Sequence, residues 1–187
     1  GIYPQSLLQS WDAALGQGTQ LATSEIVAGV LAAASQGPGV INLSLGGSEF
    51  EIPIQQAIAT AIRKGMLVVA AAGNDGEDGS PLTYPVSLPH VLTVAATDTL
   101  NRVTSFSSRS RFVDLAAPGQ DIPVATALDD SWAPEDGTSF AAPIVSGAAG
   151  WVWTVRTDLD ASQMFEVMRR SATDIETPGR DNASGYG

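Results

Sequence analysis

The feature that most constrains the fold is a continuous apolar run at residues 66–72, placed directly after a helical pattern. The apolar residues of that pattern recur at helical spacing: Ile54, Ala57, Ile58, Ala61 and Ile62. A strand pattern at residues 40–45 precedes it, so the order is strand, helix, strand. Such a crossover unit predicts parallel strands. The absence of charge from the run indicates a strand covered on both faces by helices.

Other segments extend this pattern along the chain. Helices are predicted at residues 23–35, where Thr23 is a candidate N-cap, at 138–155 and at 161–171. Further strands are predicted at 91–95 and 113–115. The expected fold class is α/β, a three-layer arrangement with a mostly parallel sheet and helices on both faces, in one domain over residues 1–187.

Composition excludes several classes of partner and chemistry. A net charge of −11 with a single lysine, Lys64, argues against a nucleic-acid partner, which would need clustered cations. Without cysteine, the chain forms no disulfide, thiolate nucleophile or thiolate metal site. Its apolar stretches are too short to span a membrane, so no membrane partner is expected.

The segment 137–143 places Ser139 at the start of a buried helix. Free backbone N–H groups and the helix dipole favour negative charge there, which suits a nucleophile whose attack creates an oxyanion. Pro143 cannot donate to the Ser139 carbonyl, so the first turn is predicted to be loose. The alternative is that Thr138 or Ser139 only caps the helix.

Asn74 follows the carboxyl end of the run at 66–72, where open parallel sheets bind ligands. Its amide can donate to a developing oxyanion. The alternative interpretation is an ordinary turn, because the sequence there is Asn-Asp-Gly.

Five segments in this order resemble the subtilase (subtilisin-like) family of serine proteases: 41–47, Gly73-Asn74, Tyr84-Pro85, 117–119 and 137–139. The resemblance implies that Ser139 is the acylating nucleophile and that Asn74 and the Ser139 N–H are the oxyanion donors. A related family with the same fold has an aspartate at the oxyanion position, so Asn74 favours the subtilases.

The resemblance also implies a binding site for a peptide or protein substrate. Its residues fall in three groups: an edge for the extended peptide at Ser44, Leu45, Gly46 and Gly47; a pocket wall at Ala70, Ala71, Ala72 and Gly73; and Thr83 near the pocket floor. Threonine at that floor predicts a shallow pocket that prefers small or medium side chains.

Two members of the family's triad have no counterpart here. In subtilisin the order is Asp, His, Ser, and residues 1–4 already resemble the segment after the histidine helix. We therefore expect an upstream segment of the same gene product to carry Asp and His and to insert a strand between residues 7–11 and 41–45. The domain is expected to be truncated at its N-terminal side and to lack the family's final helix. Without that segment, this chain alone is expected to be unable to catalyse peptide hydrolysis.

The remaining titratable residues are given other roles. His90, the only histidine, is interpreted as structural or solvent-facing, and Asp136 as a loop or helix-start residue. The other loop acids are Asp121, Asp129, Asp130 and Glu135. No cofactor is required, and the resemblance is compatible with bound calcium.

The leading hypothesis is a serine endopeptidase that acts on extended peptides, and the family resemblance implies an extracellular location. The rival is a non-catalytic relative that binds peptides or partners along the same groove. A purely structural module is disfavoured because it leaves the pairing of Asn74 with Ser139 unexplained.

Overall fold

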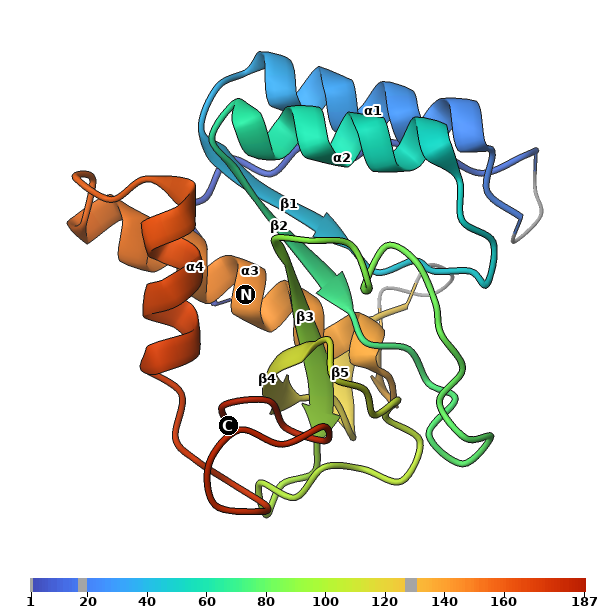
Figure 1. Cartoon of the computed structure of the whole chain (residues 1–187), viewed down its shortest axis with the longest axis vertical. Coiled ribbons are helices and arrows are strands. Elements are labelled where there is room, and N and C mark those ends of the chain that lie inside the picture. The colour runs from blue at the N-terminus through green and yellow to red at the C-terminus, as the bar shows by residue number, and fades with distance from the viewer. Residues whose placement is uncertain (1, 17–19, 127–130) are drawn as a thin grey trace.

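A four-stranded parallel sheet with the strand order β1-β2-β3-β4 forms the centre of the protein (Figure 1). The structure is a computed structural model that describes residues 2–16, 20–126 and 131–187. The sheet strands are β1 (Gly39–Leu43), β2 (Met66–Ala71), β3 (Val91–Thr97) and β4 (Val113–Pro118). The helices are α1 (Thr23–Ser35), α2 (Ile52–Arg63), α3 (Thr138–Val155) and α4 (Ala161–Arg170).

Alternate side chains of the buried strand β2 belong to two different cores. Met66, Val68 and Ala70 pack with α1 and α2 on one face of the sheet. Leu67 and Val69 pack with α3 and α4 on the other face. Period-two alternation puts successive side chains on opposite faces, so a fully apolar strand needs both layers. The predicted three-layer α/β fold with a parallel sheet is confirmed.

The structure differs from the expectations at several elements. Ala22, not Thr23, is the N-cap of α1, and the Thr23 hydroxyl instead donates to a Glu51 carboxylate oxygen. A hairpin of β5 (Ile122–Ala125) and β6 (Trp132–Glu135) was not predicted; its prolines and short length gave no clear strand pattern. Residues 7–11 form no strand, and none of the backbone hydrogen bonds of the described residues pairs them with another segment.

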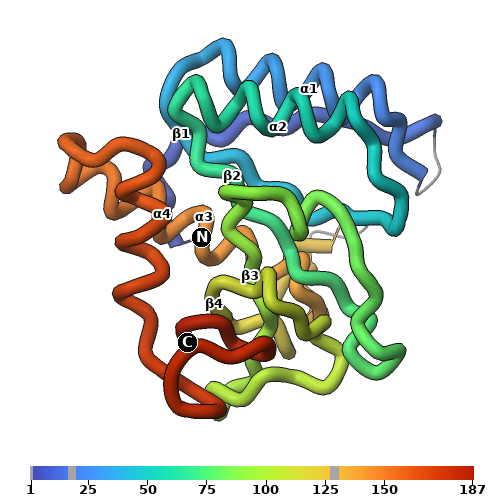
Figure 2. Tube along the Cα trace, in the orientation of Figure 1, coloured from blue at the N-terminus to red at the C-terminus, as the bar shows by residue number. Residues whose placement is uncertain are grey.

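The two outer edges of the sheet end in different ways. The C-terminal tail lies along β4, where Tyr186 N donates to Asp114 O and Ala116 N donates to Gly187 O, both at 2.9 Å. Figure 2 shows the tail folding back toward the sheet. Along β1, none of the backbone hydrogen bonds of the described residues reaches a segment other than β2. Within the described part of the chain, no helix is long and apolar enough to cross a membrane.

Candidate active site

The residues predicted to act together, Asn74 and Ser139, meet beyond the carboxyl end of β2. Asn74 is exposed in the turn that follows β2, and Ser139 is half-buried in the first turn of α3. They are joined through Thr138, whose backbone N donates to Asn74 Oδ1 at 2.9 Å. The tertiary structure thus brings together two segments that are far apart in sequence.

Thr138 also fixes the orientation of the Asn74 amide. Its hydroxyl donates to the same Oδ1 at 2.9 Å and accepts from Gly73 N at 3.2 Å. Because two donors converge on Oδ1, the Nδ2 group must point elsewhere. Thr138 has no exposed surface, so water does not reach the Thr138 side of these hydrogen bonds. The sequence predicts only a capping role for Thr138, although its place directly before the serine was an available signal.

Two N–H groups remain free to bind an anion at this point. Among the hydrogen bonds of the described residues, neither Asn74 Nδ2 nor Ser139 N has an acceptor. Nδ2 lies near Gly137, where an added Cβ would sit 3.4 Å from it. Two unpaired donors, one of them at the start of a helix, are the type of group from which an oxyanion hole is built.

The first turn of α3 is connected to the segment that follows β1. Pro143 is inside the helix and cannot donate to the Ser139 carbonyl, as predicted. The Ser44 hydroxyl supplies the missing hydrogen bond and donates to Ser139 O at 2.9 Å. The chain therefore positions the Ser139 backbone from both sides, through Thr138 and through Ser44.

Two residues not identified from the sequence support Ser44. Asn42 Nδ2 donates to Ser44 Oγ at 3.0 Å, and Ser146 Oγ donates to Asn42 Oδ1 at 3.1 Å. Asn42 is exposed on β1, and Ser146 lies two turns into α3. Neither residue forms a motif alone, because only the packing of α3 on β1 brings them together.

The predicted peptide-binding edge borders a cavity of about 750 Å³. Ser44, Leu45, Gly46 and Gly47 all line it. Gly47 N donates to Tyr84 O at 3.0 Å, and Tyr84 N donates to Gly47 O at 2.9 Å. Both backbone groups of Gly47 are therefore already hydrogen-bonded. Ser44, Leu45 and Gly46 are left as the edge that can pair with a peptide.

The other predicted substrate-binding residues lie in different environments. Ala70, Ala71 and Ala72 are buried and belong to the cores, so only their backbone can form a pocket wall. Gly73 has a φ of 105°, and an added Cβ would lie 2.9 Å from Ser108 Oγ. Thr83 is half-buried, accepts from Ser87 Oγ at 2.7 Å through its carbonyl and does not line the cavity.

The remaining candidate residues lie away from Ser139 or in its loops. His90 is exposed at the amino end of β3, whereas Asn74 follows the carboxyl end of β2. Because the two strands are parallel, these residues lie at opposite ends of the sheet. Asp136 accepts from Asp121 N at 2.7 Å and so fixes the β5–β6 hairpin. Glu135 is exposed at the end of β6, whereas Asp129 and Asp130 fall outside the described residues.

Within the described ranges, no group of three or more His, Asp or Glu side chains could hold a metal ion. Bound calcium therefore remains a prediction from the family resemblance. The chemistry that these residues themselves offer is a hydroxyl beside two free N–H donors.

Comparisons with known proteins agree with this geometry. The sequence matches the Subtilase family (Peptidase S8) over residues 1–187. It is 37% identical to subtilisin DY of Bacillus licheniformis over 162 residues, 86% of this chain and 58% of the relative. It is also 37% identical to the minor extracellular protease Epr of Bacillus subtilis (strain 168), over 79% of this chain and 23% of the relative.

A solved structure, the S41 psychrophilic protease, superimposes with a TM-score of 0.83 at 32% identity and covers 92% of this chain. The chain spans 65% of that protein, and 58% of subtilisin DY. The likeness therefore extends through the whole chain but only part of each relative.

Proposed function

This chain belongs to the subtilase family of serine peptidases, and we propose that it supplies the nucleophile and the oxyanion donors of an endopeptidase acting on extended peptides. One observation carries the proposal: Thr138 holds the Asn74 amide beside Ser139 with its N–H groups unpaired. A capping serine or a simple turn would not require this arrangement.

The proposed reaction is acyl transfer through Ser139. A histidine takes the proton from Ser139 Oγ as that oxygen bonds to the substrate carbonyl carbon. Negative charge moves to the carbonyl oxygen, which accepts from Asn74 Nδ2 and Ser139 N. The imidazolium then protonates the leaving amine as the C–N bond breaks, and water hydrolyses the ester by the same steps.

The histidine and its orienting aspartate are proposed to come from an upstream segment of the same gene product. His90 lies at the amino ends of the strands, opposite the end that carries Asn74, and this sequence contains no other histidine. The free edge of β1 and the exposed Leu7 and Leu8, with relative exposures of 89% and 87%, support a strand docking there. Buried unpaired backbone groups cost about 1–3 kcal/mol each, so such a strand would be held firmly.

An extracellular location is proposed on the same basis. The relative named minor extracellular protease Epr supports it by name. The net charge of −11 is compatible with that location but does not require it.

The test is active-site labelling of the full-length protein with a fluorophosphonate. We expect labelling that is lost in Ser139→Ala, whose fold should be intact because one oxygen is removed at a helix start. Asn74→Ala should bind peptide but lose about 10²–10³ in kcat, the range known for removing this donor from subtilisin.

Labelling that persists in Ser139→Ala would show that the nucleophile lies elsewhere. Peptide binding without labelling of the full-length protein would favour the rival, a non-catalytic relative that uses the same groove. The circular dichroism spectrum of each variant controls for loss of fold.

A further inference from the structure

The cavity beside Ser44 combines an apolar body with an acidic rim. It lies between α1, α2 and the loop after β1, and Ser44 links it directly to the Ser139 backbone. Leu45, Ile54, Phe50 and Tyr84 provide apolar and aromatic walls, with the Phe50 and Tyr84 rings 5.0 Å apart in an edge-to-face contact. Such walls accept an aliphatic chain.

Two carboxylates border this cavity. Glu49 is exposed in the loop after β1, and Glu51 is half-buried just before α2. The Thr23 hydroxyl donates to Oε2 of Glu51 and so fixes its position, while Oε1 has no hydrogen-bond partner among the described residues. Glu49 forms no ion pair with any described residue.

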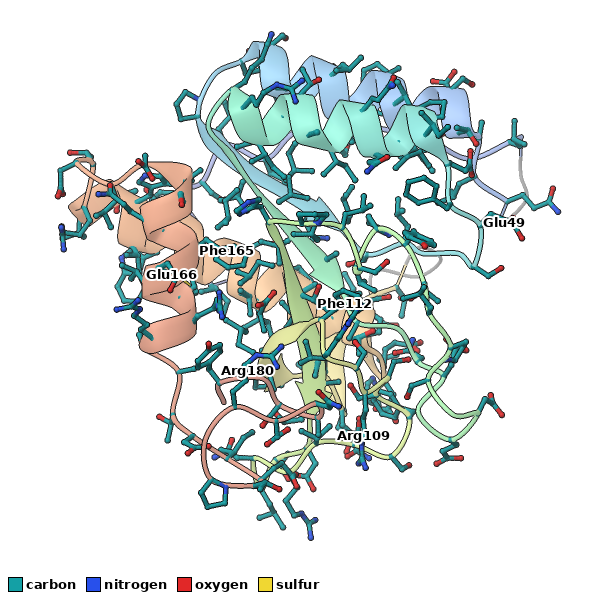
Figure 3. The ribbon with its side chains drawn as sticks, viewed as in Figure 1. Glu49, Arg109, Phe112, Phe165, Glu166 and Arg180 are labelled. Atoms are coloured by element: carbon teal, nitrogen blue, oxygen red, sulfur yellow. The ribbon has the colours of Figure 1, made fainter. Side chains whose placement is uncertain are left out.

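Among the described residues, no lysine or arginine forms an ion pair with either carboxylate. The cavity lining contains no lysine or arginine, and the first cation of the sequence is Arg63. Residues 112–155, which include Ser139, also hold no lysine or arginine. Figure 3 shows Glu49 well apart from Arg109 and Arg180.

We propose that this cavity selects a lysine or arginine side chain of the substrate, on the amino side of the scissile bond. The proposal rests on the proposed function, because it assumes that a peptide pairs with the edge at Ser44, Leu45 and Gly46. The aliphatic stem lies on the apolar walls, and the charged end reaches Glu49 and Glu51 at the rim. Charge complementarity of this kind raises specificity more than it raises overall affinity.

The experiment compares peptides that differ at one residue. Lysine and norleucine share an aliphatic stem, so their ratio isolates the charge. Each of the four positions before the scissile bond is varied in turn with lysine, arginine, norleucine and glutamate, and kcat/KM is measured with the full-length protein. At one position we expect lysine to exceed norleucine by about three- to tenfold, with glutamate the poorest substrate.

Matched variants locate the source of that preference. Glu49→Gln and Glu51→Gln should each reduce the lysine-to-norleucine ratio by about two- to fivefold, and the glutamine at 51 can still accept from Thr23. Asp158→Asn removes the same charge just beyond the far end of α3 from Ser139 and should leave the ratio unchanged. The ratio should also fall in 1 M salt, where charges are screened beyond about 3 Å.

The proposal is overturned if no position prefers lysine, or if the ratio is unchanged in the Glu49→Gln/Glu51→Gln double variant. Binding of the same peptides to Ser139→Ala, followed by fluorescence anisotropy, separates it from the proposed function. Lysine-selective binding without fluorophosphonate labelling of the parent protein would reject the protease and keep this inference. Labelling and cleavage without a lysine preference would keep the protease and reject this inference. The absence of both binding and labelling would reject both proposals.

Discussion

The two edges of the sheet are built from similar apolar strands, but among the described residues only β4 is covered by another part of the chain. At β4 the tail pairs with Asp114 and Ala116, and Arg169 lies 4.5 Å over the Tyr186 ring to hold that tail in place. At β1 no such tail pairs with the strand among the described residues, and Leu7 and Leu8 of the N-terminal segment are almost fully exposed. Unpaired sheet edges readily accept another strand, so β1 is the edge at which the proposed upstream strand would pair.

The largest effect is expected where the tail passes closest to β4. Gly185 has a φ of 68°, and an added Cβ would lie 2.2 Å from the Asp114 carbonyl. Gly185→Ala should therefore reduce the free energy of unfolding by about 2–5 kcal/mol, through backbone strain and displacement of the tail. Urea unfolding monitored by tryptophan fluorescence measures this change.

Gly179→Ala is the matched control in the same tail. Its φ of 86° imposes the same type of strain, but nothing lies within 4 Å of an added Cβ. Gly179→Ala should therefore reduce the free energy of unfolding by only about 1 kcal/mol. Equal losses for the two variants would show that contact with β4 does not hold the tail.

A smaller loss of stability is expected when Arg169, the nearer of two arginines over the Tyr186 ring, is replaced. Arg169 Nε lies 3.4 Å from Asp114 Oδ1, and Nη1 lies 3.0 Å from Glu166 Oε1. Arg169→Met should cost about 1–3 kcal/mol, because it leaves the buried Asp114 without its nearest cation. Arg170→Met, at an exposed neighbour, should cost less than about 0.5 kcal/mol in the same unfolding assay. A larger loss for Arg170→Met than for Arg169→Met would contradict this account of the closed edge.

The closed edge should also respond to pH in a defined direction. Burial raises the pKa of Asp114 above its ordinary value of 3.8; the Thr93 N–H and the cations of Arg169 and Arg180 only partly oppose it. The folded state thus binds this proton more tightly than the unfolded state. The contribution of Asp114 to stability should fall as pH rises from 3.8 through the raised pKa.

Comparison with Asp114→Asn isolates this effect, since other acidic groups titrate alike in both proteins. The free energy of unfolding of the wild type relative to the variant should decline with rising pH across that window. A difference that stays constant with pH, or rises with it, would contradict a raised pKa.

The smallest effect is expected at the open edge. Leu8→Ser should change the free energy of unfolding of this chain by less than about 0.5 kcal/mol, because Leu8 has a relative exposure of 87%. Leu115→Ala, in the buried part of β4, should cost about 2–5 kcal/mol. If an upstream strand covers the β1 edge, Leu8→Ser should cost more in the full-length protein than in this chain, and equal small losses would argue against that strand.

The sequence by itself determined the layers of the fold. The apolar run at residues 66–72, flanked by helical patterns, requires a strand buried on both faces, and β2 is that strand. The prediction for Pro143 also followed from local covalent chemistry, because proline has no N–H to donate to Ser139. Motif order identified Asn74 and Ser139 as candidates, and the structure places them together; their catalytic roles remain predictions.

Only the tertiary structure decided how those candidates are held. Hydrogen bonds from Thr138 to Asn74 and from Ser44 to Ser139 join residues 64 and 95 positions apart. Such contacts depend on how α3 packs against the sheet, which no local pattern specifies. The same holds for the acidic cavity, since Glu51 is fixed by Thr23 across 28 positions. Local propensity and periodicity act over a few residues, whereas these contacts are set by the packing of whole elements.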